Sequence, residues 1–113
     1  MSSPSVLVVD DDADFRAMVR LRLEDVGVRV HEASTGDAAL MAITTGSVPD
    51  LVIADLRLPG IDGREVRDHL AYSRPEVPVH VWSALPRTGA DVSVKDLAVL
   101  SDLLRRHCGI KTS

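Results

Sequence analysis

The sequence predicts an α/β protein built on a doubly wound, five-stranded parallel sheet. Two unbroken apolar runs, Val6–Val9 and Leu51–Ala54, are bounded by polar and turn-forming residues, which is typical of parallel strands buried on both faces. Segments with helical spacing of apolar residues alternate with these runs and with three weaker strand-like runs. Such alternation over 113 residues favours one sheet with right-handed crossovers.

Composition excludes several classes of protein. The chain is 45% hydrophobic with a formal net charge of −4, so we expect a packed core and no direct binding to nucleic acid or an anionic membrane. A single cysteine, Cys108, excludes an internal disulfide and fits a reducing compartment. Because neither a signal-peptide pattern nor an apolar run of roughly 18 residues is present, we expect a cytoplasmic protein with no membrane contact.

The first half of the chain predicts two strand–helix units. A strand over Ser5–Val9 runs into three acids, and a helix over Ala13–Val26 ends at Gly27. The run Val28–Glu32 alternates between apolar and polar residues, which favours a strand at or near the edge of the sheet. Capping-box spacing of Ser34 and Asp37 predicts a second helix, which continues through Thr45 and ends at Gly46.

The second half begins with the buried strand that ends on Asp55. A loop carrying Pro59, Gly60 and an Asp62-Gly63 pair follows, and we expect a third helix over Gly63–Tyr72. The remaining predicted elements are strands over Val77–Trp82 and Asp91–Val94 and a helix over Asp96–His107.

The connection between the last two predicted strands is unusually short. Only eight residues, 83–90, separate them, whereas a parallel crossover usually takes a dozen or more. Eight extended residues span roughly 26–29 Å, and a return along a five-residue strand needs roughly 17 Å. A parallel return without a helix is therefore possible. The alternative is a hairpin, which would put Lys95 at the wrong end of the sheet.

Each of these two strands has one apolar face and one mixed face. His80 and Trp82 share the mixed face of the first strand, and Asp91 and Ser93 share that of the second. This pattern predicts that a helix layer is missing over the mixed face, with His80 and Ser93 exposed to solvent. Trp82 is then either a packing residue or an anchor for a partner.

Acidic side chains follow two of the buried strands. Asp10 and Asp11 come after the first and Asp55 ends the third, and side chains at the carboxyl ends of adjacent parallel strands converge. Carboxylates this close raise one another's pKa unless a cation is present, and Mg²⁺ uses oxygen ligands of this kind. Asp12 is expected to cap the following helix or to face solvent rather than bind the metal directly.

Metal positions left open beside a carboxylate favour phosphoryl chemistry. Asp55 can then act as a nucleophile that forms an acyl phosphate. The transition state needs a cation and hydrogen-bond donors opposite the metal. Lys95 is the candidate cation, and the hydroxyl of Ser83 and the N–H of Ala84 are the candidate donors.

The chain resembles the receiver domain of two-component response regulators, and is similar to the single-domain chemotaxis type. The motifs that carry the resemblance, over residues 5 to about 108, are Val6-Leu7-Val8-Val9-Asp10-Asp11-Asp12, Pro49-Asp50-Leu51-Val52-Ile53-Ala54-Asp55, Leu58-Pro59-Gly60-Ile61-Asp62-Gly63, Ser83-Ala84 and Val94-Lys95. The first two are highly specific together. The resemblance implies a single flavodoxin-like domain over residues 1–113 with strand order 2-1-3-4-5 and the helix between strands 4 and 5 shortened or absent.

The resemblance also assigns roles to residues. It implies that Asp55 accepts a phosphoryl group from a phosphohistidine on a histidine kinase or a histidine phosphotransfer protein. It implies Mg²⁺ held by Asp11, Asp55 and the Arg57 carbonyl, with Asp10 acting through water. Ser83 would be the switch hydroxyl, Lys95 the cationic partner of the phosphate, and Arg57 an influence on the rate of acyl-phosphate hydrolysis.

Output is expected through contact with a downstream protein, since no residues remain for a DNA-binding or catalytic domain. A homodimer is also possible. The chain departs from the family pattern in three ways: it has no room for the usual fourth helix, Asp96 replaces the proline after the lysine, and Val92 stands at the aromatic switch position.

Two alternative functions stay open at this point. One is a receiver-like interaction module that works without phosphorylation. The other is a haloacid-dehalogenase-like phosphatase, because Asp10-x-Asp12 after an apolar strand is similar to that family's first motif, although Ala13-Asp14 follow it and the chain is short for the remaining motifs.

Overall fold

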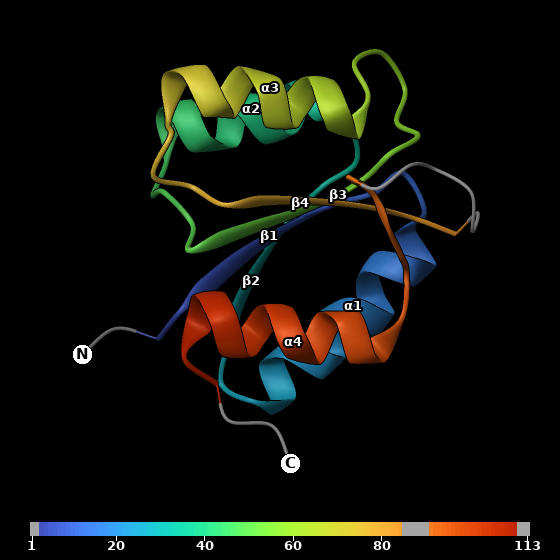
Figure 1. Ribbon diagram of the computed structural model, residues 1–113, viewed down its shortest axis with the longest axis vertical. Coiled ribbons are helices and arrows are strands. Elements are labelled where there is room, and N and C mark those ends of the chain that lie inside the picture. Colours follow the sequence, from blue (N-terminus) through green and yellow to red (C-terminus); the bar gives the residue numbers. More distant parts are fainter. Residues whose placement is uncertain (1–2, 85–90, 111–113) are drawn as a thin grey trace.

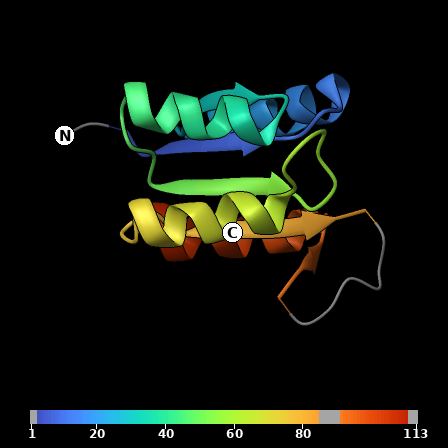
Figure 2. The ribbon, with the colours of Figure 1, turned by 90° about the horizontal axis from the view of Figure 1, so that it is seen from above.

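The computed structural model describes residues 3–84 and 91–110 and contains the predicted five-stranded parallel sheet. The strand order is β2-β1-β3-β4-β5, and every neighbouring pair is parallel. The strands are β1 (Ser5–Val9), β2 (Arg29–Ala33), β3 (Leu51–Asp55), β4 (Val79–Ser83) and β5 (Ser93–Val94). The arrowheads of β1, β3 and β4 point to the same end of the molecule, so side chains that follow these strands share one edge (Figure 2).

Four helices are described, and they cover the two faces of the sheet in pairs. They are α1 (Ala13–Asp25), α2 (Gly36–Thr45), α3 (Gly63–Ser73) and α4 (Leu97–Cys108). Figure 1 shows α2 and α3 on one side of the sheet and α1 and α4 on the other. Because successive strand residues point to opposite faces, Val6 and Val8 pack toward α1 and α4, whereas Leu7 and Val9 pack toward α2 and α3.

The helix ends follow capping chemistry, although the cap of α2 differs from the one that the sequence predicts. The Asp12 carboxylate accepts hydrogen bonds from the N–H groups of Asp14 and Phe15, and Gly27 takes a positive φ of 85° directly after the C-cap of α1. The predicted Ser34–Asp37 box is wrong, because Thr35 caps α2 and accepts from the N–H of Ala38. The two hydroxyl residues are adjacent, and spacing alone did not distinguish them.

The return from β4 to β5 is parallel, and the hairpin alternative is therefore wrong. Trp82 is in register with Ser93, and Ser83 with Val94. Nine residues separate the two strands, of which the structure describes 84, 91 and 92, and none of these three is helical. The side chains of Arg64 and Arg67 on α3 hold Asp91 at 2.9 and 2.8 Å, which fixes the approach to β5.

The prediction about the uncovered face is wrong. Trp82 is only 2% exposed and packs in the core with Leu100 and Leu103 of α4, so a helix covers the mixed face. His80 and Ser93 are half-buried and contact each other through a hydrogen bond. The exposed apolar residue of β5 is Val94, at 43%, which points to the opposite face. Trp82 is a packing residue, and its alternative role as a partner anchor does not fit this burial.

Gly63 allows α3 to begin close against the end of β3. A Cβ atom at this position would lie 2.4 Å from the Asp55 carbonyl oxygen and 3.1 Å from the side chain of Val81. The Gly63 N–H also donates to the Leu56 carbonyl at 3.1 Å. Asp62 forms a capping box with Glu65 at the same helix end. The loop after β3 is therefore held by both of its ends.

Substitution of Gly63 tests the close approach of α3 to the end of β3. Gly63→Ala is expected to lower the free energy of unfolding by about 2 kcal/mol, because the added methyl group overlaps backbone atoms that cannot move freely. Gly27→Ala is the control, since open space surrounds that position and only its positive φ is unfavourable, at a cost of about 1 kcal/mol. Urea unfolding followed by Trp82 fluorescence measures both. An equal or smaller loss for Gly63→Ala would contradict the packing described above.

Candidate functional site

The three acids predicted to converge lie together at the carboxyl edge of the sheet. Asp10 follows β1, Asp55 ends β3, and carboxylate oxygens of Asp10, Asp11 and Asp55 all lie within 4.8 Å of one another. Asp10 and Asp55 are buried, at 1% and 8% exposure, whereas Asp11 is exposed. The cluster therefore has a buried floor and one side open to solvent. Asp12 is an exposed helix cap, as expected.

Lys95 lies against the buried floor of this cluster. Its Nζ is 2.6 Å from the Asp10 Oδ2 atom and 3.4 Å from the Asp55 Oδ2 atom. The lysine reaches this place because β5 returns parallel to β4, and its N–H donates to the Ser83 carbonyl at 3.0 Å. Three carboxylates against one ammonium leave two negative charges in a partly desolvated pocket.

The environment of Asp55 raises its pKa. Burial is the main cause, and repulsion by Asp10 adds to it, while attraction to Lys95 and a hydrogen bond from the Arg57 N–H act in the opposite direction. That N–H lies 3.3 Å from the Asp55 Oδ1 atom. Desolvation therefore exceeds the compensation that the protein supplies, and a further cation would favour the ionised carboxylate.

The cluster fits a hard divalent cation. Its donor atoms are carboxylate oxygens, the ligand type that Mg²⁺ prefers, and one acid faces solvent where metal-bound water can remain. In the described part of the chain, the Asp11 carboxylate accepts no hydrogen bond from the protein, which leaves its oxygens available. The Arg57 carbonyl as a further ligand stays a prediction.

Ser83 ends β4 at the same edge of the sheet. Trp82 is in register with Asp55, so Ser83 lies one residue beyond the acceptor along the neighbouring strand, and it is 2% exposed. Ala84 follows it and is exposed, as is Arg57 in the loop after β3. The roles of the Ser83 hydroxyl and the Ala84 N–H stay predictions.

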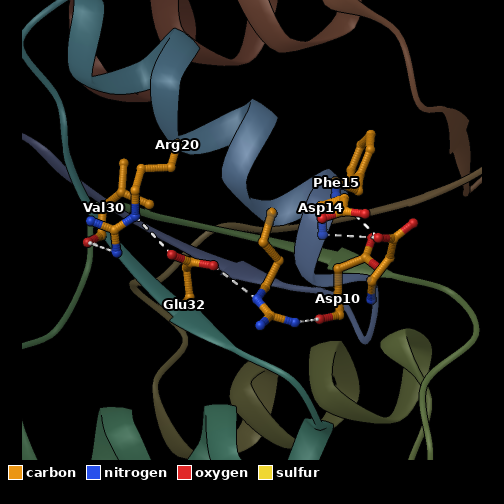
Figure 3. Close-up of polar contacts among 8 residues, drawn as sticks. Asp10, Asp14, Phe15, Arg20, Val30 and Glu32 are labelled. Atoms are coloured by element: carbon orange, nitrogen blue, oxygen red, sulfur yellow. Dashed lines mark hydrogen bonds and ion pairs between the residues drawn. The ribbon is translucent and has the colours of Figure 1, made fainter.

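Two residues near the site had no functional signal in the sequence. The Lys95 Nζ atom lies 4.3 Å from the centroid of the Phe15 ring, and this ring meets Trp82 edge-on at 5.6 Å. Arg16 donates from Nη1 to the Asp10 carbonyl at 2.6 Å and from Nε to Glu32 at 2.9 Å. Figure 3 shows the polar contacts that lead from Asp10 to Glu32 and on to Arg20. The helical spacing of Phe15 predicts only a core residue. The contact of Arg16 with Glu32 joins residues 16 positions apart, which no local pattern indicates.

Comparison with known proteins agrees with this geometry. Residues 6–99 match the family described as the response regulator receiver domain. The chain belongs to this family. The match excludes the haloacid-dehalogenase-like family for this chain, and the flavodoxin-like receiver fold has the predicted strand order.

Similar proteins include longer regulators. The KDP operon transcriptional regulatory protein KdpE of Escherichia coli is 39% identical over 107 residues, which are 94% of this chain and 46% of KdpE. The transcriptional regulatory protein PrrA of Mycobacterium tuberculosis is 37% identical over 102 residues, covering 90% of this chain and 42% of PrrA. The chain thus spans less than half the length of these relatives.

Among solved structures, the response regulator TrrA of Thermotoga maritima, crystallised in complex with Mg²⁺-BeF, superposes with a TM-score of 0.82. Its sequence identity is 26%, and the match covers 91% of this chain and 97% of TrrA. Over the described residues of this receiver domain, no helix is long and apolar enough to cross a membrane.

The raised pKa of Asp55 generates a prediction about stability. Because the folded protein holds this proton more tightly than the unfolded chain, the free energy of unfolding falls as pH rises from below the ordinary value of 3.8 through the raised value. Asp55→Asn is therefore expected to stabilise the Mg²⁺-free protein at pH 7, because the neutral amide avoids the desolvation of a buried carboxylate. The gain should vanish below pH 4 and in saturating Mg²⁺.

Urea unfolding at several pH values measures this effect. Asp12→Asn is the control, because Asp12 is an exposed cap and Asn caps a helix equally well. A loss of stability for Asp55→Asn at pH 7 without Mg²⁺ would contradict the electrostatic description of the cluster.

Proposed function

We propose that this receiver domain accepts a phosphoryl group on Asp55 in a reaction that requires Mg²⁺, and that it signals by contact with another protein. The observation that carries the proposal is the placement of Asp55. Its carboxylate belongs to an acidic cluster that is open to solvent at Asp11, and it lies 3.4 Å from the ammonium group of Lys95. A nucleophile beside both a candidate metal site and a fixed ammonium group is the arrangement that phosphoryl transfer needs.

The proposed transfer forms one bond to phosphorus and breaks another. An oxygen of the ionised Asp55 carboxylate forms a bond to phosphorus, and the phosphorus–nitrogen bond of a phosphohistidine breaks. The imidazole leaves with the electron pair of that bond, and the product is an acyl phosphate on Asp55. The Lys95 Nζ atom is 3.4 Å from the attacking carboxylate and can stabilise the negative charge on the phosphoryl oxygens.

Asp11 and Asp55 would hold Mg²⁺, with Asp10 acting through water and the Arg57 carbonyl as a further ligand. The bound ion would neutralise charge on the phosphoryl oxygens. Support comes from the 4.8 Å cluster of oxygens and from TrrA, whose crystal structure is described as a complex with Mg²⁺-BeF. Ser83 is proposed as the hydroxyl that contacts the phosphoryl group, and Arg57 as the residue that influences hydrolysis.

The proposed phosphodonor is a histidine kinase or a histidine phosphotransfer protein. The chain is proposed to promote its own phosphorylation and dephosphorylation and to act on no separate substrate. KdpE and PrrA are named as transcriptional regulatory proteins, and the present chain matches less than half of each, so its own output partner is proposed only as a protein. The second candidate, an interaction module that works without phosphorylation, is favoured by Val92 at the aromatic switch position and by the short crossover.

The direct test is phosphorylation by a small donor. Incubation with Mg²⁺ and acetyl phosphate is expected to add one phosphoryl group to the intact mass of the protein, and Asp55→Asn or removal of Mg²⁺ should abolish it. Asp37→Asn, an exposed acid on α2, is the matched control and should leave the adduct unchanged. The absence of an adduct on the wild-type protein would overturn the proposal and favour the interaction module.

Lys95 gives a prediction with two readouts of opposite sign. Lys95→Met should slow acetyl-phosphate labelling at least tenfold, since the transition state loses its fixed cation; removal of one charge-stabilising group typically costs roughly a hundredfold. The same change should tighten Mg²⁺ binding, because it removes a positive charge beside the acids. Labelling is followed by intact mass and binding by calorimetry. Weaker Mg²⁺ binding with unchanged labelling would contradict this role.

A further inference from the structure

We infer that Arg16 is a positioning residue that holds the Asp10–Asp11 turn in the shape that receives Mg²⁺, and that it anchors this turn to the edge strand β2 through Glu32. The inference rests on the proposed function and extends it to a residue outside the acidic cluster. Arg16 lies on the first turns of α1, and its side chain is only 17% exposed.

The backbone of Asp10 is held on both sides. Its N–H donates to the Ala33 carbonyl at the end of β2 at 3.0 Å, and its carbonyl accepts from the Arg16 Nη1 atom at 2.6 Å. The Asp10 Oδ1 atom accepts from the Asp12 N–H at 2.9 Å, which closes the turn over Asp11. Because the Asp11 carboxylate has no protein donor of its own in the described residues, its position follows from the backbone on either side of it.

Arg16 is itself held by Glu32. The Nε atom of Arg16 lies 2.9 Å from Oε1 of Glu32, and the Nε atom of Arg20 lies 2.7 Å from Oε2. Arg20 also donates to the Val30 carbonyl at 3.2 Å (Figure 3). Both arginines therefore join α1 to the edge strand. Burial raises the pKa of Glu32, but hydrogen bonds from Arg20 and Arg16 outweigh this effect and lower it, which keeps the carboxylate ionised.

The geometry uses a property that lysine lacks. The rigid guanidinium fork presents donors in two directions, so one side chain reaches a carbonyl and a carboxylate at the same time. A lysine ammonium has three N–H donors on one nitrogen, so it would have to make both contacts from a single atom rather than from the separate Nη1 and Nε atoms that Arg16 uses.

A positioning role and a purely electrostatic role for Arg16 predict opposite changes in Mg²⁺ affinity when the arginine is removed. A positive charge near a cation site repels the cation, so loss of Arg16 as a charge alone should tighten Mg²⁺ binding. If Arg16 holds the turn, its loss should weaken binding, because outer partners of metal ligands typically contribute about 10- to 100-fold to affinity.

The test compares Arg16→Met with Arg20→Met in the full chain. Both changes remove one arginine contact to Glu32 and one positive charge from the same helix, but only Arg16 contacts the metal-binding turn. Mg²⁺ titration by calorimetry should give about tenfold weaker binding for Arg16→Met and no more than a twofold change for Arg20→Met. Without Mg²⁺, the Asp12 amide should exchange its hydrogen faster in Arg16→Met only.

Arg16→Lys separates charge from geometry and serves if the methionine variant does not fold. It is expected to bind Mg²⁺ more weakly than the wild type, since the two contacts can no longer be made from separate nitrogen atoms. Wild-type affinity in Arg16→Lys, or unchanged or tighter binding in Arg16→Met, would overturn the inference while leaving the proposed function intact. A wild-type protein that binds no Mg²⁺ would instead overturn the proposed function and this inference with it.

Discussion

The contact of Lys95 with two buried carboxylates is the interaction on which the site depends. It brings together β1, β3 and the residue after β5, three segments that are distant in the chain. The parallel return of β5 is needed for it, and the two-residue strand is held by its pairing with β4 and by the arginines of α3 that bind Asp91. Because Lys95 compensates only part of the local negative charge, the cluster that it holds together remains compatible with a divalent cation.

The short connection between β4 and β5 changes the surface beside the site but leaves the acidic cluster and Lys95 together. The described residues complete the acidic cluster, its lysine and the core beneath them, although the connection from β4 to β5 leaves little room for a helix. Asp91 bridges to α3 through Arg64, and Val94 is exposed on β5. The placement of the acids and of Lys95 therefore depends on the ends of the strands.

The sequence was sufficient for those features that depend on local pattern. Apolar runs located β1 and β3 to the residue, and the acids at their ends converge as parallel strands require. The length of the linker between β4 and β5 was compatible with both a parallel return and a hairpin, and only the pairing of Trp82 with Ser93 decided between them.

The helix layer over His80 and Trp82 was not predictable from alternation. A mixed strand face can be covered by α4 when its polar side chain finds a partner, as His80 does in Ser93. The role of Arg16 depends on contacts across three elements, for which spacing carries no signal.

The most direct test of the electrostatic account is the pKa of Asp55 itself, measured by carboxyl carbon NMR with and without Mg²⁺. In the metal-free protein the pKa of Asp55 is expected to lie above the ordinary value of 3.8, because burial and Asp10 outweigh Lys95 and the Arg57 N–H. Addition of Mg²⁺ should lower it, since the ion favours the charged form. A pKa at or below the ordinary value in the metal-free protein, and unchanged by Mg²⁺, would contradict the view that this cluster is an incompletely compensated site for a divalent cation.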